Sequence, residues 1–388
     1  MLPSEEAARR LGVKVSTLYA YVSRGLLASH PEPGGRRSLF DLGDIERLTV
    51  RQRGGRQVES RLATITTGVT QLRQDDGPFY RGRRATELAA EMTFEEVTSL
   101  LWEVEAEAGD DWEAPALGLC PLEQASDRMR WALVMCAAND PLRSDPRPAS
   151  VARAARRVIA ALTDVVGTGP APAPAPGART SIAQRLARRL DAAPCGEGVS
   201  LSAAAVNAAL ILMADHELST STVAVRIAAS TQADIYDALL AGLATMAGPL
   251  HGGASQQAYE LLVTVERDGA ARALNDILRW QKYLPGFGHV IYKSRDPRFH
   301  ALWELAAPLL SEERRELFLQ VMELAAAHDV PAPNCDLALA ALSWGTDMPP
   351  DAGRTIFTIA RIAGWTAHYQ EERLERPLRF RARAVYSV

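Results

Sequence analysis

The sequence predicts an all-α protein in which a small N-terminal head precedes a larger helical body. From Tyr80 onward, apolar residues recur at helical spacing, and no segment alternates with the period of two that is typical of a strand. The first 50 residues instead combine short helical segments with glycine turns. The chain has 388 residues, of which 47% are hydrophobic, so it can form two or three domains with a substantial core.

The composition favours a cytoplasmic protein without membrane contact. No run approaches the roughly 18 to 20 uninterrupted apolar residues that span a bilayer, and the opening MLPSEEAARR lacks the apolar segment of a secretory signal. The four cysteines are widely spaced and form no CxxC pair, so neither a disulfide framework nor a cysteine zinc site is expected.

The net charge of −4 is unevenly distributed along the chain. Residues 1–60 carry ten Lys and Arg against seven acidic residues, which is +3 and leaves −7 for the remainder. This asymmetry indicates that the head and the body have different roles.

The head has the pattern of a helix-turn-helix module. Residues 4–11 and 13–23 are predicted helices about a glycine turn, the segment 36–40 (RRSLF) is basic and strand-like, and a third helix is expected at 42–48. In a helix-turn-helix the second helix enters the major groove of DNA.

Residues 1–50 resemble the winged helix-turn-helix heads of MerR-type regulators and phage excisionases, on the phrase Gly-Arg-Arg, aromatic, Asp-Ile. The resemblance implies that one group of side chains faces DNA and another holds phosphates. These are, respectively, Ser16, Thr17, Tyr19 and Arg24, and then Arg36 and Arg37. A helical module for dimerisation or docking is the alternative, since +3 is modest for a DNA binder.

The body follows a polar, glycine-containing linker at 51–60. Thr93 and Glu96 have the spacing of a capping box for a helix over 94–103. Further helices are predicted at 86–90, 201–213, 226–230, 235–247, 270–280, 299–327, 337–344 and 353–372. The alternating Ala-Pro segment 168–178 can be neither helix nor central strand, and we expect an extended insertion within the helical body.

The chemistry-bearing residues of the body gather in four short motifs. Two of them, GPLHGGAS at 248–255 and PGFGHVIYKSRDPR at 285–298, place a histidine among glycines. Glycines let the backbone bend sharply and a ligand approach closely, so both histidines are expected to work on loops. The other two motifs are Asp-His-Glu at 215–217 and Pro-Asn-Cys-Asp at 333–336.

In this order the motifs resemble those of the citrate synthase family, whose signature loops are GPLHGGAS, PGFGH followed nine residues on by the arginine of DPR, and N-x-D. The resemblance covers roughly residues 61–388. It implies a large helical domain over 61–251 and 346–388 and a small domain over 252–345.

The resemblance also implies the reaction, in which acetyl-CoA, oxaloacetate and water give citrate and CoA. Asp336 would be the base, His251 would donate to the thioester oxygen, and His289 would polarise and protonate the keto oxygen. No permanently bound cofactor and no metal ion are expected.

Substrate binding follows from the same resemblance. Arg298, Arg361 and Arg376 would hold the carboxylates together with His216, because a guanidinium matches a carboxylate in geometry. In the family the last arginine reaches in from the other subunit, which implies a homodimer. Lys293 and Gly288 would contact CoA.

Two departures leave alternatives open. The family usually carries an asparagine where this chain has Ser219 or Thr220, and the strands before Tyr80-Arg81-Gly82 differ. A 2-methylcitrate synthase that uses propionyl-CoA fits the motifs equally well. A regulator whose citrate-synthase-like body senses a metabolite is the alternative from another class.

Overall fold

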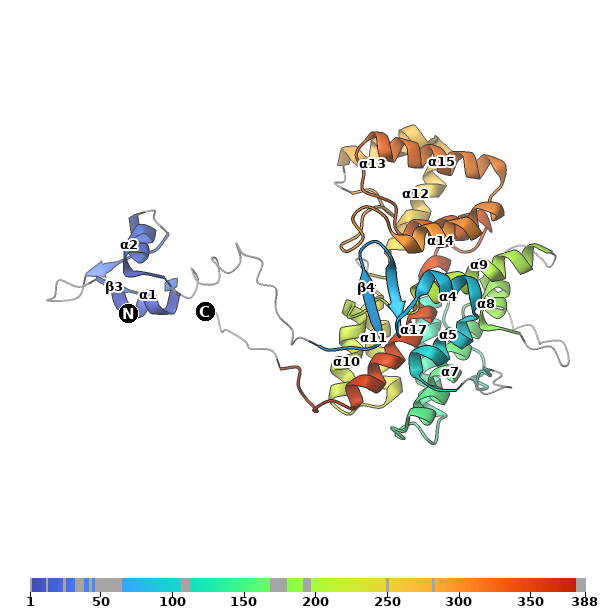
Figure 1. Cartoon of the computed structure of the whole chain (residues 1–388), viewed down its shortest axis with the longest axis horizontal. Coiled ribbons are helices and arrows are strands. Elements are labelled where there is room, and N and C mark those ends of the chain that lie inside the picture. Colours follow the sequence, from blue (N-terminus) through green and yellow to red (C-terminus); the bar gives the residue numbers. More distant parts are fainter. Residues whose placement is uncertain are drawn as a thin grey trace. The chain divides into compact units, whose positions relative to one another are not determined.

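The computed structural model describes residues 2–11, 13–23, 26–31, 38–41, 44–45, 65–105, 112–167, 180–190, 197–248, 251–280 and 283–381. The chain divides into two compact units, one of Met1–Thr66 with Phe380–Val388 and one of Thr67–Arg379 (Figure 1). The predicted linker 51–60 and insertion 168–178 lie outside the described residues, as does most of the predicted helix 42–48.

The first unit is a small helical module with a three-stranded antiparallel sheet. Helices α1 (Ser4–Leu11) and α2 (Val15–Ser23) pack with strands β1 (Leu2–Pro3), β2 (His30–Pro31) and β3 (Ser38–Phe40), in the order β1-β3-β2. Helix α1 buries Ala7, Ala8 and Leu11 at helical spacing against Leu18 and Phe40. The two predicted helices of the head are confirmed, although α2 begins two residues later than predicted.

The second unit begins with a small antiparallel sheet. Its strands are β4 (Thr70–Arg73), β5 (Gly77–Tyr80) and β6 (Arg83–Arg84), in sequence order. The body is otherwise helical in its described part. Its helices are α4 (Ala85–Glu91), α5 (Phe94–Trp102), α6 (Ala125–Ala138), α7 (Pro148–Val165), α8 (Ile182–Leu190), α9 (Glu197–Met213), α10 (Thr220–Ser230), α11 (Ile235–Met246), α12 (Ala254–Asp268), α13 (Ala270–Trp280), α14 (Pro297–Ala306), α15 (Glu312–Ala327), α16 (Cys335–Gly345) and α17 (Ala352–Arg373).

Sequence rules explain one predicted helix start, at Thr93, and also explain why one predicted helix is wrong. Thr93 accepts the Glu96 N–H while Glu96 accepts the Thr93 N–H at 2.7 Å, so the predicted capping box is confirmed. The single helix predicted at 299–327 is wrong. The chain breaks there into α14, a 3-10 turn at Ala307–Leu309 that contains Pro308, and α15, which Ser311 caps.

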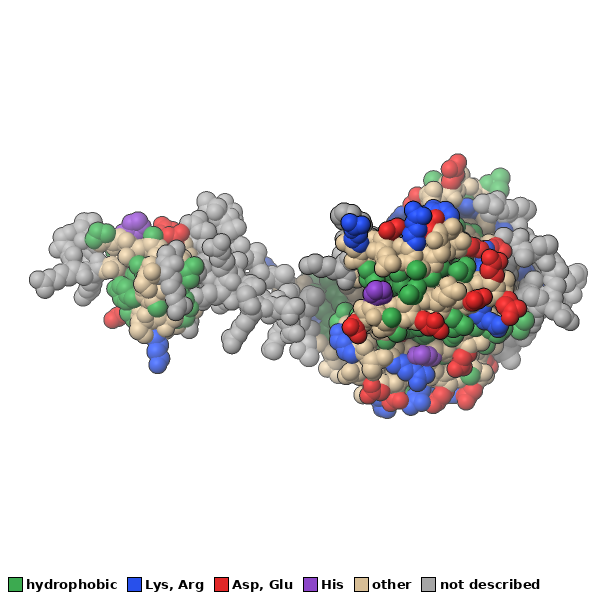
Figure 2. Space-filling model, turned by 90° about the horizontal axis from the view of Figure 1, so that it is seen from above, with side chains coloured by type: hydrophobic (Ala, Val, Ile, Leu, Met, Phe, Trp, Pro, Cys, Tyr) green, Lys and Arg blue, Asp and Glu red, His purple; other side chains and the backbone are tan. Residues whose placement is uncertain are grey.

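Helix α17 is the axis of the body. It is buried along most of its length in the main hydrophobic core, and Figure 1 shows it running through the lower part of the unit, beneath α14. A second, smaller core joins α12, α13 and α15, which Figure 1 shows together at the top. Figure 2 shows charged side chains of both signs interspersed over one face of this unit. No helix in the described ranges is long and apolar enough to cross a membrane.

Three groups hold the C-terminal end of α9, where the last carbonyls of a helix have no intrahelical partner. The Tyr80 hydroxyl, which has one proton to donate, lies 3.0 Å from the Ile211 oxygen at the end of α9 and 3.1 Å from the Asp215 oxygen. Arg361 donates from Nε to the Met213 oxygen at 2.9 Å, and the Gly364 N–H donates to the Ala214 oxygen at 3.1 Å. Strand β5 and helix α17 thereby hold the turn that follows α9.

Candidate active site

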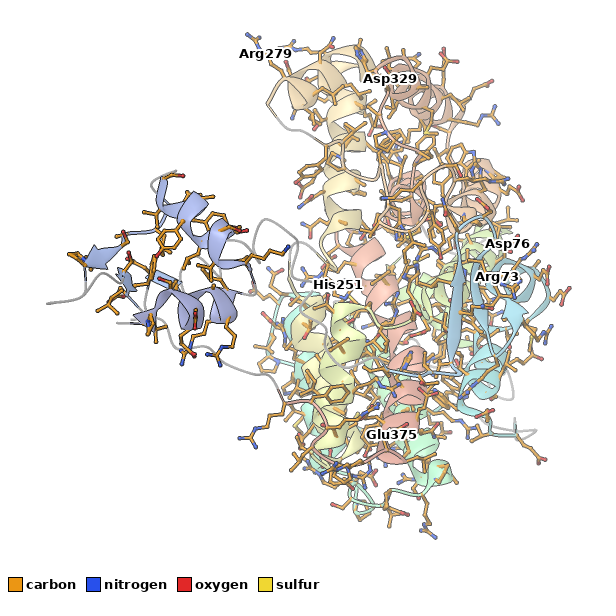
Figure 3. All side chains as sticks on the ribbon, turned by 60° about the vertical axis from the view of Figure 1, so that its left-hand side comes forward. Arg73, Asp76, His251, Arg279, Asp329 and Glu375 are labelled. Atoms are coloured by element: carbon orange, nitrogen blue, oxygen red, sulfur yellow. The ribbon has the colours of Figure 1, made fainter. Side chains whose placement is uncertain are left out.

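His251 lies in the loop between α11 and α12, where Figure 3 labels it. Gly252 must be a glycine, because a Cβ there would lie 2.4 Å from the Met246 oxygen. The His251 Nε2 lies 2.8 Å from the Ser221 hydroxyl, and its ring meets Phe357 edge-on at 6.3 Å. Burial, followed by the charge of Arg361, lowers the pKa of His251 to about 4, so the imidazole is neutral at pH 7.

His289 is held in one tautomer by the backbone of its own loop. Its Nδ1 accepts the N–H groups of Ile291 at 3.1 Å and Tyr292 at 3.2 Å, so the proton of the neutral ring is on Nε2. That Nε2 lies 3.4 Å from Nη2 of Arg298, and both atoms are donors. Burial and then the Arg298 charge lower the pKa of His289 to about 4. Two donors therefore converge where an anionic or carbonyl oxygen of a ligand could accept from both.

Asn334 joins the His289 loop to helix α16. Its side chain caps α16 by accepting the Asp336 N–H at 3.0 Å and donates to the Gly288 oxygen at 2.8 Å. Its own N–H donates to the Gly286 oxygen at 2.9 Å. Gly286 has a φ of +82°, and a Cβ there would lie 2.8 Å from the Leu337 Cβ. The N-x-D motif thus places Asp336 in the first turn of α16.

The Asp336 carboxylate is half-buried and accepts no hydrogen bond within the described part of the chain. Burial raises its pKa to about 6, although Arg298 lowers it. A carboxylate with a pKa near neutral and a free lone pair is suited to remove a proton from a weak carbon acid.

Arg298 is buried and paired with a buried carboxylate. Asp296 accepts from its Nε at 3.0 Å and its Nη2 at 2.9 Å, and also accepts the Cys335 N–H at 3.1 Å. Burial lowers the pKa of Arg298, but the attraction of Asp296 outweighs burial and holds this pKa well above its ordinary value. The guanidinium is therefore charged.

Arg361 is buried without an acidic partner. The residue is only 1% exposed. Its guanidinium donates from Nε to the Met213 oxygen and from Nη1 to the Ser219 hydroxyl at 3.2 Å. No carboxylate forms an ion pair with it among the described residues. Burial lowers the pKa of Arg361, and the buried Asp215 opposes this only from beyond ion-pair distance. A buried charge that is compensated only in part is costly, so this site favours an anionic ligand.

His216 completes the cluster. Its Nε2 lies 3.1 Å from the Tyr292 hydroxyl, and its ring meets the His289 ring edge-on at 5.3 Å. Burial, followed by the charges of Arg298 and Arg361, holds the pKa of His216 well below its usual range. The structure therefore brings together the six predicted residues His216, His251, His289, Arg298, Asp336 and Arg361.

The remaining predicted residues lie at the edge of this cluster or away from it. Lys293 is exposed and donates to the His289 oxygen at 3.3 Å, and Gly288 lies in the loop with a φ of +77°. Arg376 is exposed beyond the end of α17 and does not join the cluster.

The profile "Citrate synthase, C-terminal domain" matches residues 60–378. The chain belongs to the citrate synthase family. A second profile, "Helix-turn-helix domain", matches residues 1–53, which confirms the predicted type of the head.

Curated relatives and solved structures agree with this membership. Citrate synthase 2 of Bacillus subtilis is 34% identical over 182 residues, 45% of this chain and 49% of the relative. The 2-methylcitrate synthase 2 of Corynebacterium glutamicum is 33% identical over 178 residues, 44% of this chain and 46% of the relative. The chain thus spans about half the length of the curated relatives that it matches.

Two solved structures share the fold. Citrate synthase from Thermotoga maritima has a TM-score of 0.67 at 23% identity, over 85% of this chain and 95% of that one. The ternary complex of carboxymethyl coenzyme A and oxaloacetate with citrate synthase from Thermoplasma acidophilum has a TM-score of 0.69 at 23% identity, over 86% and 95%. The predicted citrate-synthase-like fold is confirmed.

Several residues around this cluster were not predicted. Ser221 and Phe357 contact His251, Tyr292 contacts two histidines, and Asp296 orients Arg298. Tyr292 and Asp296 lie inside a predicted motif, and Asp296 precedes a proline where a helix cap is common. Ser221 and Phe357 carried no local signal, because they meet His251 only in the fold.

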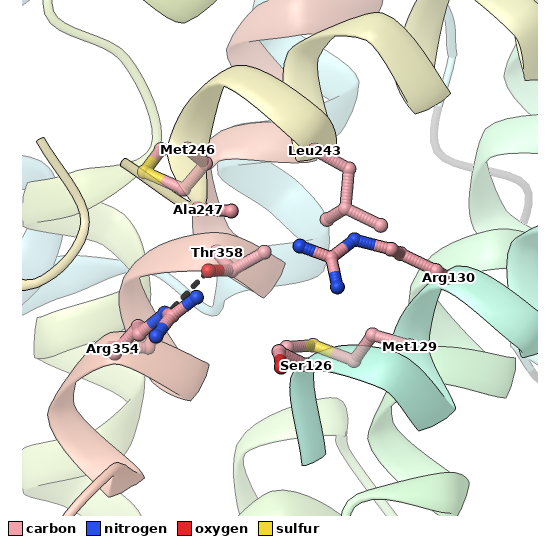
Figure 4. Close-up of a pocket in the computed structure, with 8 residues that line it drawn as sticks. All are labelled: Ser126, Met129, Arg130, Leu243, Met246, Ala247, Arg354 and Thr358. Carbon is pink, nitrogen blue, oxygen red and sulfur yellow. Dashed lines mark hydrogen bonds between the residues drawn. The ribbon is translucent and has the colours of Figure 1, made fainter. Parts of the chain in front are cut away.

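Two other hollows border α17 but lack these groups. One, drawn in Figure 4, is lined by residues of α6, α11 and α17, with Arg130 and Arg354 on opposite sides. A neighbouring pocket of about 280 Å³ is lined by Gln124, Gln256 and Asp351 among others. Neither of these two hollows is lined by a histidine.

Three of the six residues predicted to contact DNA lie within the described part of the head. Ser16 is exposed and Thr17 is half-buried on α2. Tyr19 is 43% exposed, but its hydroxyl lies 3.0 Å from the Ser4 hydroxyl and its ring packs edge-on against Phe40. Arg24, Arg36 and Arg37 lie outside the described residues.

The dual role of Asn334 gives a testable prediction. Asn334→Ala removes a helix cap and a buried bond to the Gly288 oxygen, so we expect a loss of about 2 to 3 kcal/mol in the free energy of unfolding, measured in urea. Ser311→Ala removes only the cap of α15 and should cost about 1 kcal/mol. Equal losses in the two variants would show that the bond to Gly288 contributes nothing.

Proposed function

We propose that the chain is a citrate synthase, which condenses acetyl-CoA with oxaloacetate and water to give citrate and CoA. The observation that carries the proposal is the buried, unpaired guanidinium of Arg361 in a cluster with Arg298, three neutral histidines and Asp336. Two buried guanidinium groups, of which Arg361 has no ion-pair partner among the described residues, fit a dicarboxylate ligand. The solved Thermoplasma complex with oxaloacetate supports this choice.

Each group has a role set by its protonation state. Asp336 removes a proton from the methyl group of the thioester, and the neutral His251 donates a hydrogen bond to the thioester oxygen as the enol forms. The enol carbon attacks the keto carbon, and the developing oxygen anion accepts hydrogen bonds from His289 Nε2 and from Arg298. The anion takes the Nε2 proton and becomes the hydroxyl group of citrate, and solvent then returns a proton to His289. Water then hydrolyses the thioester and releases CoA, whose phosphates lie toward Lys293 and the Gly288 loop.

The acyl group of the thioester substrate has one close alternative, the propionyl group that a 2-methylcitrate synthase uses. Citrate synthases and 2-methylcitrate synthases both occur among the relatives at about one third identity. Acetyl-CoA is proposed because it needs the least room beside His251 and Phe357, whose rings are in contact.

The active unit is proposed to be a homodimer. Arg376 is exposed and lies away from the cluster in its own chain. A second copy related by a two-fold axis can supply Arg376 to the keto-acid pocket, so that each site contains residues of both subunits.

A second function is favoured by the head, which the helix-turn-helix profile matches over residues 1–53. We propose that it binds DNA through α2 and the basic segment that contains Arg36 and Arg37. The protein would then combine a condensing enzyme with a regulator, or use the enzyme body to sense a metabolite.

The condensation is tested by release of free thiol from acetyl-CoA in the presence of oxaloacetate. Asp336→Asn is expected to lower kcat by about 100-fold or more, because it removes the base. Asp268→Asn, an exposed carboxylate paired with Arg267, should leave turnover unchanged. Folded wild-type protein that releases no thiol would contradict the proposal, and faster release from propionyl-CoA would assign the 2-methylcitrate reaction instead.

The pH dependence follows from the raised pKa of Asp336, about 6. The carboxylate is the active form, so kcat/KM should be constant above about pH 7 and fall toward tenfold per pH unit below pH 6. His251 and His289, with pKa values of about 4, remain neutral over this range. A constant kcat/KM down to pH 5 would show that another group sets the proton transfer.

Subunit complementation tests the role of Arg376. Asp336→Asn and Arg376→Ala should each be nearly inactive alone. Refolded together in equal amounts, they should recover roughly a quarter of wild-type activity, because half of the dimers are mixed and each mixed dimer has one intact site. No recovery, or an active Arg376→Ala variant, would contradict a site shared between subunits.

DNA binding is tested by gel shift with DNA from the promoter of the protein's own gene. Arg36→Ala/Arg37→Ala is expected to weaken binding by about tenfold or more and to reduce its salt dependence. Arg9→Ala/Arg10→Ala makes the same change in charge on α1, where both arginines pair with Glu6, and should have a smaller effect. Absence of a shift by the wild-type protein would contradict the proposal.

A further inference from the structure

A buried polar chain lies directly behind the keto-acid side of the site. Arg226 on α10 is fully buried and is held by two carboxylates of α17, Glu371 at 2.6 Å and Glu372 at 2.8 Å. Its Nη1 also lies 2.9 Å from Nδ1 of His368, which is fully buried on the same helix α17. The chain therefore ties α10 to α17 beneath the active site.

The hydrogen bonds of this chain determine the tautomer of His368. Arginine can only donate, so Nδ1 of His368 must accept from Arg226. The proton of the neutral ring is then on Nε2, which lies 3.3 Å from Oδ2 of the buried Asp215. His368 thus donates to Asp215, and Arg226 keeps it in the form that can do so.

Asp215 in turn shapes the turn that carries His216. Its Oδ2 accepts the Glu217 N–H at 3.0 Å, and Glu217 has a φ of +54°, which is unfavourable for a residue with a side chain. A Cβ at Gly364 would lie 2.2 Å from Asp215 Oδ1, so α17 approaches this turn as closely as a glycine allows. His216 lies at the centre of the turn, between Asp215 and Glu217, whose N–H the Asp215 carboxylate accepts.

We propose that His368, oriented by Arg226, is a positioning residue for the keto-acid pocket, which acts by holding Asp215 and through it the His216 turn. The inference rests on the proposed function, because it takes the ligand to be a keto dicarboxylate. It assigns His368 no contact with the substrate. The other groups that bear on the Asp215 carboxylate are Arg361, the Thr70 hydroxyl, Glu217 and Tyr80, none of which replaces the bond from His368.

The proposal predicts that loss of the His368 bond changes keto-acid binding but not acetyl-CoA binding. The His251 side of the site depends on Ser221, Phe357 and the loop at Gly252, and Asp336 depends on Asn334. None of these contacts passes through His368. Loss of the bond to Asp215 should therefore weaken keto-acid binding while the KM for acetyl-CoA changes little.

The test uses two amide variants that each reproduce one nitrogen of the imidazole. In His368→Gln the amide reaches the position of Nε2 and can donate to Asp215, whereas in His368→Asn it reaches only the position of Nδ1 and can bond Arg226. Thr366→Val is the matched control, because it removes a buried hydroxyl on the same helix that bonds only the Ile362 oxygen. Oxaloacetate binding is measured by calorimetry, with the KM values of both substrates and thermal unfolding of each full-length variant.

We expect His368→Asn to bind oxaloacetate about tenfold or more weakly, and His368→Gln and Thr366→Val to remain within about threefold of wild type. Equal affinities in all variants, or equal losses in the Asn and Gln variants, would overturn the proposal. A parallel rise in the KM for acetyl-CoA would also overturn it, since it would indicate general disorder of the site. Wild-type protein that fails to bind oxaloacetate would instead overturn the proposed function, and this inference with it.

Discussion

The positive charge of Arg361, buried without an ion-pair partner among the described residues, is the constraint on which the site depends. The backbone oxygen of Met213 on α9 and the hydroxyl of Ser219, which precedes α10, hold the guanidinium, but they carry no full negative charge. A charge in this position is stabilised when a carboxylate enters the pocket, so substrate binding and charge compensation become one event. Arg298 differs, because Asp296 already neutralises it and fixes its direction.

Burial and the same two arginines determine the protonation state of the three histidines. Burial and the neighbouring arginines lower the pKa of His216, His251 and His289, so all three are neutral donors or acceptors rather than acids at pH 7. Asp336 experiences the opposite effect, since burial raises the pKa of a carboxyl group. The result is a weak base beside neutral donors, which is the combination that enolisation of a thioester requires.

Local rules in the sequence predicted the parts of the fold that depend on neighbours along the chain. The capping box at Thr93 and the glycine loops around His251 and His289 are examples, because a cap or a tight backbone approach requires particular residue types. The helix predicted at 299–327 was wrong, because periodicity alone does not register the break at Pro308. Ser221, Phe357 and His368 could not be predicted as site residues, since each contacts its histidine or aspartate over 30 residues or more, or through another helix.

The most direct test of the central claim is the affinity for oxaloacetate of Arg361→Met, measured by calorimetry beside Arg354→Met, which changes a half-buried arginine on the same helix. If the carboxylate of the ligand compensates Arg361, the first variant should lose about 100-fold in affinity and the second should bind like wild type. Oxaloacetate binding of wild-type strength by folded Arg361→Met would contradict the account.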